Sequence, residues 1–163
     1  MTSFHVRPAT KNDLPLICTV EVDSFPDPYP AALMARLQRT HSESFFVAEN
    51  PSSELVGYCV ASEKEGSAHL ISIGVLREHR RKGVGAALLE TLLVWLNERR
   101  VEELWLEVNT GNNAAINFYE RFGFARVMTI ENYYADGSPA AKMMLPMRER
   151  AEELGASVRG RKV

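Results

Sequence analysis

A strand–helix–strand pattern at residues 69–108 constrains the fold of this chain more than any other feature. Residues 69–75 and 104–108 are short apolar runs, the pattern of strands inside a sheet. Between them, apolar residues recur at helical spacing over 84–98. Parallel strands need a long crossover, usually a helix, so the pattern predicts a βαβ unit.

Shorter patterns extend this unit into a mixed sheet flanked by helices, an α/β (α+β) fold. Three prolines in residues 26–30 interrupt the first helical region and predict a loop there. Further helices are predicted at 14–22, 31–39 and 114–121, the first capped by Thr10 or Asn12. Further strands are predicted at 4–7, 45–48, 55–61, 124–130 and 142–147.

The 163 residues correspond to a single domain, which we assign to residues 1–147, followed by a polar, basic tail at 148–163. The formal net charge of −2 argues against general polyanion binding, so we predict no specific nucleic-acid partner. No apolar stretch reaches the length of a membrane span, and the N-terminus lacks a signal-peptide pattern. Cys18 and Cys59 are predicted to be free, buried thiols, so the chain is predicted to be cytoplasmic.

A basic, glycine-rich turn precedes the 84–98 helix, with the sequence Arg80-Arg81-Lys82-Gly83-Val84-Gly85. The glycines permit close approach of a ligand, and the first N–H groups of a helix attract anions. A Rossmann fingerprint is disfavoured because Leu88 stands where its third glycine would be. The remaining alternatives are an anion-binding cradle and a solvated basic loop.

A second motif lies further along the chain. Its order and its distance from the basic turn decide between these alternatives. It consists of Leu104-Trp105-Leu106-Glu107-Val108, then Asn112, then Ala115 to Phe124 with Tyr119 inside it. Together with R-x-x-G-x-G, this motif resembles the GNAT superfamily of N-acetyltransferases over roughly residues 4–147. The resemblance implies a GNAT fold, in which two central parallel strands splay apart.

The resemblance also implies an acetyl-CoA (coenzyme A) site. The pantetheine arm would pair with backbone groups of Ile73, Gly74 and Val75, one of whose N–H groups would stabilise the oxyanion. Asn112 would contact the cofactor, cap the helix that follows, or do both. The diphosphate would lie on the basic turn, whose motif begins at Arg80. The residues that would contact it are Arg81, Lys82, Gly83, Val84, Gly85 and Ala86.

Three residues match catalytic positions: Tyr119 that of the superfamily, Glu107 that of its ribosomal-protein-alanine acetyltransferases, and His69 that of several N-terminal acetyltransferases. Tyr119 would protonate or hydrogen-bond the departing thiolate, although its spacing alone also suits a core tyrosine. Glu107 would accept the amine proton, and partial burial is expected to raise its pKa; the alternative is a structural salt bridge. His69 would join this relay or serve a structural role. We predict no functional metal site.

Two loops resemble the acceptor-binding loops of N-terminal protein acetyltransferases, the ribosomal-protein-alanine and archaeal NatA-like enzymes. One holds Phe25, Asp27 and Tyr29; the other holds Tyr133 and Tyr134 before Asp136-Gly137. Asp27 replaces the glutamate common in relatives, and Ser138 stands where an acidic residue is usual. The tyrosines could instead only cap the edge of the sheet.

The resemblance therefore predicts acetyl transfer to the α-amine of a protein or peptide in a ternary complex. One alternative is a GNAT enzyme for a small amine or a lysine side chain. Another is a non-catalytic CoA-binding or ribosome-docking subunit, favoured only by the basic tail with Arg148, Arg150, Arg159, Arg161 and Lys162. Expected partners are peptide N-termini, with a ribosome or an auxiliary subunit as further candidates and with no membrane. A monomer or weak homodimer is expected.

Overall fold

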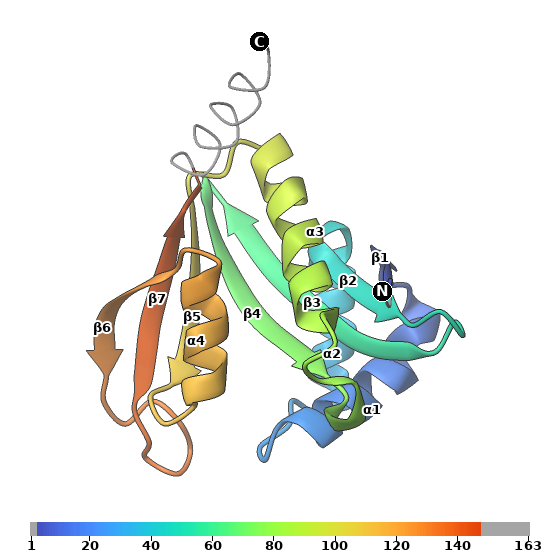
Figure 1. Cartoon of the computed structure of the whole chain (residues 1–163), viewed down its shortest axis with the longest axis horizontal. Coiled ribbons are helices and arrows are strands. Elements are labelled where there is room, and N and C mark those ends of the chain that lie inside the picture. The colour runs from blue at the N-terminus through green and yellow to red at the C-terminus, as the bar shows by residue number, and fades with distance from the viewer. Residues whose placement is uncertain (1–2, 148–163) are drawn as a thin grey trace. The chain divides into compact units, whose positions relative to one another are not determined.

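The computed structural model describes residues 3–147 and contains the predicted mixed sheet (Figure 1). Within these residues, hydrogen bonding orders seven strands as β1-β2-β3-β4-β5-β7-β6. The strands are β1 (His5–Pro8), β2 (Phe45–Glu49), β3 (Leu55–Lys64), β4 (Ser67–Val75), β5 (Glu103–Asn109), β6 (Ala125–Ile130) and β7 (Ala140–Pro146). The helices are α1 (Leu14–Ser24), α2 (Ala31–Thr40), α3 (Val84–Glu98) and α4 (Asn113–Arg121), with short 3₁₀ turns η1 (Lys11–Asp13), η2 (Ser42–Ser44) and η3 (Arg77–His79).

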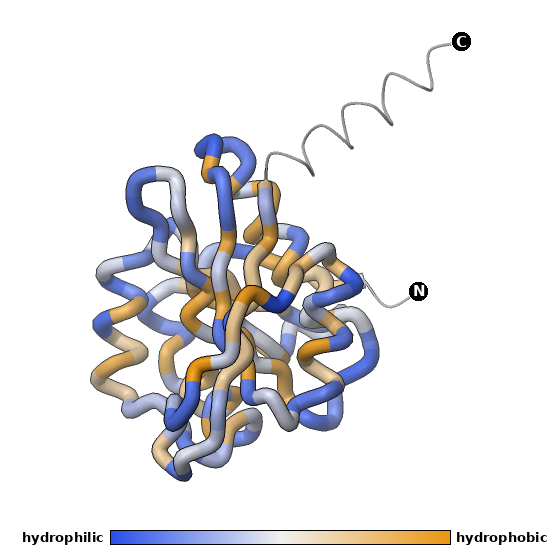
Figure 2. The backbone as a smooth tube through the Cα atoms, turned by 90° about the vertical axis from the view of Figure 1, so that its left-hand side faces the viewer, coloured by the Kyte–Doolittle hydropathy of each residue, from blue (hydrophilic) through white to orange (hydrophobic). Residues whose placement is uncertain are grey.

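The described residues divide into two compact units, 3–62 with 70–98 and 63–69 with 99–147. Strand β4 contributes to both. Figure 2 shows hydrophobic residues along the strands and hydrophilic residues in the loops that join them. None of the described helices combines the length and apolar character needed to cross a bilayer. The predicted basic tail lies outside the described residues.

In the first unit, the alternation of side chains along β3 gives the sheet two different buried faces. Tyr58 and Val60 pack with α1 and α2 through Ile17, Val20 and Met34. On the other face, α3 lies against β1 and β2. Cys59 faces this second layer, since its thiol lies 3.9 Å from the carbonyl oxygen of Leu88.

Glycine at two positions of this unit allows β3, β4 and the two helical layers to approach one another closely. A Cβ at Gly57 would lie 2.9 Å from Val84 Cγ1 and 3.0 Å from the carbonyl oxygen of Gly74. A Cβ at Gly74 would lie 2.9 Å from Tyr58 Cε1. These distances are shorter than van der Waals contact, so any side chain at either position would force the layers apart.

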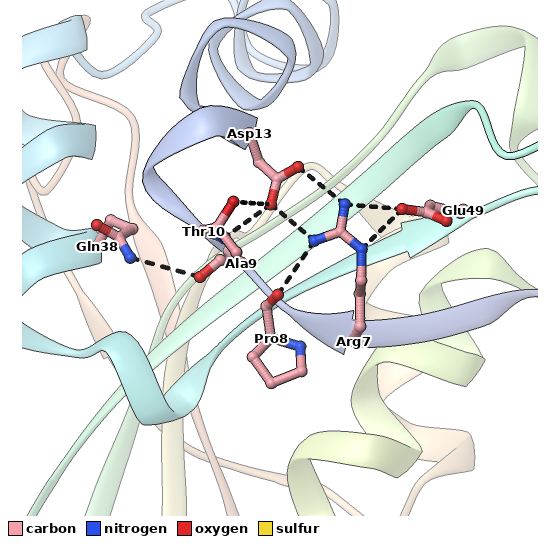
Figure 3. Close-up of polar contacts among 7 residues, drawn as sticks. All are labelled: Arg7, Pro8, Ala9, Thr10, Asp13, Gln38 and Glu49. Atoms are coloured by element: carbon pink, nitrogen blue, oxygen red, sulfur yellow. Dashed lines mark hydrogen bonds and ion pairs between the residues drawn. The ribbon is translucent and has the colours of Figure 1, made fainter.

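An ion cluster ties the N-terminal strand to η1 and to β2 (Figure 3). The Arg7 guanidinium donates to both carboxylate oxygens of Asp13, at 2.8 and 2.9 Å, and to Glu49 at 2.7 Å. Asp13 also accepts from the backbone N–H of Thr10 at 2.7 Å. Thr10 thus caps η1, whereas Asp13, and neither Thr10 nor Asn12, precedes α1 as its cap. The Arg7 guanidinium is the main cause that lowers the pKa of Asp13 to about 2.

This pKa shift predicts a pH-dependent contribution to stability. Because the folded-state pKa of Asp13 lies below its ordinary 3.8, its contribution is complete above pH 4 and disappears as the pH falls through about 2. Asp13→Asn is expected to lower the free energy of unfolding by about 1–2 kcal/mol at pH 7, after allowance for solvent screening. Urea unfolding between pH 2 and pH 7 measures this difference, and a constant difference across that range would contradict the assignment.

In the second unit, the start of β4 pairs in parallel with β5, and β5 and β6 flank β7 in antiparallel register. The predicted alternation on β5 is confirmed: Leu104, Leu106 and Val108 are buried, whereas Trp105 and Glu107 are half-buried. Strand β6 is exposed almost throughout. The βαβ unit inferred from the sequence is therefore β4–α3–β5.

The two cysteines are free, as predicted, but only one is fully buried. Cys59 is inaccessible to solvent, and burial raises the pKa of its thiol to about 12. Cys18 on α1 is half-buried, which corrects the expectation that both thiols are buried. Burial is also the largest cause that raises the pKa of Cys18.

Candidate active site

The basic turn before α3 has the backbone geometry of an anion cradle. Arg81 and Gly83 adopt left-handed conformations, with φ of 61° and 93°. Successive N–H groups in such turns form concavities that bind anions, and the first N–H groups of α3 lack intrahelical partners. A Cβ at Gly83 would meet nothing within 4 Å, so backbone conformation rather than space favours glycine there. Arg80, Arg81 and Lys82 are all exposed beside this turn.

The end of β4 is held by contacts from this turn and from α1. The carbonyl oxygen of Val75 accepts hydrogen bonds from Arg80 Nε at 3.1 Å and from Ser24 Oγ at 3.2 Å. Both of its acceptor positions are therefore engaged. The predicted pairing of Ile73, Gly74 and Val75 with a pantetheine arm would use the other backbone groups of this segment.

His69 and Glu107 form the closest polar pair among the predicted catalytic residues. Strands β4 and β5 place His69 Nε2 2.6 Å from Glu107 Oε2, and the side chains are 42% and 18% exposed. The hydrogen bond from His69 is the main cause that lowers the pKa of Glu107. The expected rise is therefore wrong: burial does oppose ionisation, but the hydrogen bond to His69 outweighs it, with help from the charge of Lys142.

A carboxylate paired with an imidazole can accept a proton near neutral pH. The carboxylate orients the ring, and a ring nitrogen held in this way can pass a proton on. This geometry also fulfils the salt-bridge alternative, so pairing by itself does not separate a structural role from a catalytic one. Lys142 lies above the Trp105 ring, 4.6 Å from its centroid, and adds positive charge to the same face of β5.

Helix α4 and its N-cap contain two further predicted site residues of the second unit. Asn112 Oδ1 accepts from the backbone N–H of Ala115 at 3.2 Å, which confirms its role as the helix cap. Tyr119 is 7% exposed and packs edge-on against Phe118 and Phe124. The core position expected from spacing alone is thus observed, and contact of either residue with a cofactor stays a prediction.

The two predicted acceptor loops lie in different units and are built differently. In the first unit, Asp27 and Tyr29 are exposed, whereas Phe25 is half-buried. In the second unit, the rings of Tyr133 and Tyr134 meet edge-on, with centroids 4.9 Å apart.

Ser138, at the position where the resemblance implied an acidic residue, holds the second loop together. Its backbone N–H donates to Asp136 at 2.9 Å, and its carbonyl oxygen accepts from the backbone N–H of Tyr134 at 3.1 Å. Its hydroxyl accepts from Asn109 at 2.9 Å. Ser138 therefore contributes hydrogen bonds within the loop and no charge.

A buried carboxylate on α1 was not identified from the sequence. Glu21 is 2% exposed, receives the hydroxyl hydrogen of Tyr58 and accepts from the backbone N–H of Tyr29 at 3.0 Å. The available signal was a glutamate on the helix face that carries Ile17 and Val20. A charged residue on an apolar face needs buried partners, and the sequence does not show which these are.

Comparison with known proteins identifies a family and several relatives. Residues 14–124 match the acetyltransferase (GNAT) family. An N-alpha-acetyltransferase of Sulfurisphaera tokodaii is 32% identical over 157 residues, covering 88% of this chain and 93% of that protein. A ribosomal protein bS18-alanine N-acetyltransferase of Escherichia coli is 33% identical over 134 residues, covering 81% and 89%. The crystal structure of Ard1 from Thermoplasma volcanium superposes with a TM-score of 0.83 at 32% identity, covering 88% of this chain and 97% of that one.

Proposed function

Because the chain belongs to the acetyltransferase (GNAT) family, we propose that it acetylates the α-amine of protein or peptide N-termini. It is an acyltransferase that uses acetyl-CoA, which supplies the acetyl group as an activated thioester. The observation that carries the proposal is the pairing of His69 with Glu107 at 2.6 Å, a base suited to an amine that must lose a proton. Relatives named as N-alpha-acetyltransferases support the choice of acceptor.

The turn before α3 holds the diphosphate in this proposal. Its left-handed residues and the first N–H groups of the helix supply donors, and Arg80, Arg81 and Lys82 supply charge. Backbone groups of Ile73–Val75 bind the pantetheine arm, and Asn112 adds a contact. The chemistry of this donor set fits a doubly charged diphosphate.

Glu107, with His69, accepts the proton from the attacking amine. A backbone N–H of residues 73–75 stabilises the developing oxyanion, and the Tyr119 hydroxyl donates to the departing sulfur. Amine, thioester and base act in one ternary complex by direct transfer, without an acylated side chain. The lowered pKa of Glu107 leaves its carboxylate ionised at neutral pH but makes it a weaker base, so the amine proton is assigned to the pair of His69 and Glu107 rather than to the carboxylate alone.

The loop with Phe25, Asp27 and Tyr29 and the loop with Tyr133 and Tyr134 bind the backbone of the acceptor. Tyr29 and Tyr133 are exposed and Tyr134 is half-buried, and tyrosine hydroxyls can hold a peptide by hydrogen bonds that do not depend on its side chains. A ribosome or an auxiliary subunit would present nascent N-termini to a catalytic domain that is itself a monomer or a weak homodimer.

Mass spectrometry of peptide products tests this proposal. The full chain is incubated with acetyl-CoA and peptides with free N-termini, each containing one internal lysine. The same peptides with a blocked N-terminus, together with spermidine and free lysine, serve as controls. We expect acetylation at the α-amine only, with at least a tenfold preference over every control. Turnover of small amines or lysine side chains alone would overturn the choice of acceptor.

A further inference from the structure

Among the described residues, Glu21 carries the most deeply buried carboxylate, yet the proposed reaction gives it no role. It is 2% exposed and lies near the end of α1, among apolar side chains of the first unit. A buried carboxylate is costly unless hydrogen bonds replace its water, and an apolar residue of similar size is often as stable or more so. Its presence therefore points to a task beyond core packing.

Both oxygens of this carboxylate have donors from different segments of the unit. Oε1 accepts from the backbone N–H of Tyr29 at 3.0 Å, and Oε2 accepts from the Tyr58 hydroxyl. The Tyr58 oxygen is also 2.8 Å from Ser72 Oγ on β4. Burial and the charge of Glu21 raise the pKa of Tyr58 far above its ordinary range, so the phenol remains a donor.

The loop between α1 and α2 has few backbone groups by which it can be held. Residues 25–30 contain three prolines, so only Phe25, Asp27 and Tyr29 have a backbone N–H. The N–H of Phe25 donates to the main-chain carbonyl of Glu21 at 3.0 Å, and the N–H of Tyr29 donates to its carboxylate. A single residue thus binds two of the three N–H groups, one at each end of the segment that displays Asp27.

We propose that Glu21 is a positioning residue that fixes the acceptor loop, with Tyr58 and Ser72 holding its carboxylate in place. The two anchors and the prolines leave the loop few conformations, so Asp27 and Tyr29 are presented to the acceptor without an ordering cost at binding. The inference rests on the proposed function of this loop in acceptor binding.

The same network reaches the backbone of β4. The Tyr58 ring packs over Gly74, where a Cβ would lie 2.9 Å from Tyr58 Cε1. Gly74 belongs to the segment proposed to bind the pantetheine arm. The ring is expected to stay in place when the Glu21 carboxylate is removed, because it is fully buried among β-strand and helix side chains. Changes at Glu21 should therefore affect the acceptor and spare acetyl-CoA.

The test compares Glu21→Leu and Glu21→Gln with Asp13→Asn, which alters another buried carboxylate of the same unit away from this loop. We expect Glu21→Leu to raise the KM for the peptide about tenfold, since a hydrogen bond to a charged group is lost, and to leave the KM for acetyl-CoA within twofold. Glu21→Gln retains an oxygen that can accept from Tyr29, and we expect about a threefold rise. Asp13→Asn should change neither KM.

Hydrogen–deuterium exchange provides a readout that does not depend on the acceptor. The prolines limit the backbone signal of residues 25–30 to three amides, and we expect faster exchange there in both Glu21 variants but not in Asp13→Asn. Unchanged exchange in the Glu21 variants would overturn the anchoring. Faster exchange with an unchanged peptide KM would overturn the positioning role. A wild-type chain that acetylates no peptide would instead overturn the proposed function, while exchange still decides the anchoring.

Discussion

Replacing Glu107 by glutamine is expected to lower kcat/KM for the peptide acceptor by about 100- to 10,000-fold, the usual contribution of a general base. The amide is of similar size and can still hydrogen-bond to His69, but it cannot take up a proton. We expect the loss to appear in kcat, because the pair acts on the amine during transfer. Steady-state kinetics at saturating acetyl-CoA measures it.

Glu103 provides a matched control on the same strand. It is half-buried on β5, and its carboxylate accepts from Ser67 on β4 at 3.1 Å, as Glu107 pairs with His69. Glu103→Gln should change kcat/KM less than twofold. An equal loss in both variants would show that β5 carboxylates support only the fold, and full activity of Glu107→Gln would remove it as the base.

The pH profile of the wild type adds a second constraint on Glu107. Its pKa lies below the ordinary value of 4.5, so the ionised form is favoured in the folded chain and is lost only when the pH falls through that lowered pKa. Protonation of Glu107 therefore cannot cause a decline in activity between pH 5 and pH 7. A decline in that range would have to come from another group, such as the amine acceptor itself.

The double variant Arg81→Gln, Lys82→Gln is expected to raise the KM for acetyl-CoA about 10- to 100-fold. Hydrogen bonds from charged donors to phosphate contribute about 1.5–3 kcal/mol each, and a tenfold change corresponds to about 1.4 kcal/mol. Because the interaction is ionic, the wild-type KM should rise with salt more steeply than that of the variant. Titration with acetyl-CoA at two ionic strengths measures both effects.

The opposite end of α3 supplies the control for this prediction. Arg99 and Arg100 are also adjacent and exposed, and Arg100 also has a positive φ, of 57°. Arg99→Gln, Arg100→Gln removes the same charge but leaves the helix N-terminus intact. Its KM for acetyl-CoA should stay within twofold of the wild type. Equal effects of the two double variants would indicate a response to net charge rather than a diphosphate site.

Local patterns were sufficient to predict most of the fold. Helical spacing located α3 to the residue, and the alternation on β5 correctly separated the buried leucines from Glu107. These features depend on neighbours within a few positions along the chain. Asn112 was predicted as a cap for the same reason, since the donor that it binds lies only three residues away.

Features that depend on distant neighbours could not be predicted in the same way. The pKa of Glu107 is lowered because His69 donates to it, and His69 reaches Glu107 only through the parallel register that pairs it with Trp105 on β5. Without that register, burial is the only cause that the sequence indicates, and it predicts a raised pKa. Glu21 shows the same difficulty, because its partners Tyr29 and Tyr58 are 8 and 37 residues away in the sequence.

The protonation of the two thiols bears on the chemistry of the reaction product. Acetyl transfer releases coenzyme A, itself a thiol that forms disulfides when oxidised. Exchange with such a disulfide requires an accessible thiolate. Burial raises the pKa of both thiols, but only Cys59 is inaccessible to solvent. Burial therefore protects Cys59 from mixed disulfides with this product, and it protects the half-buried Cys18 less.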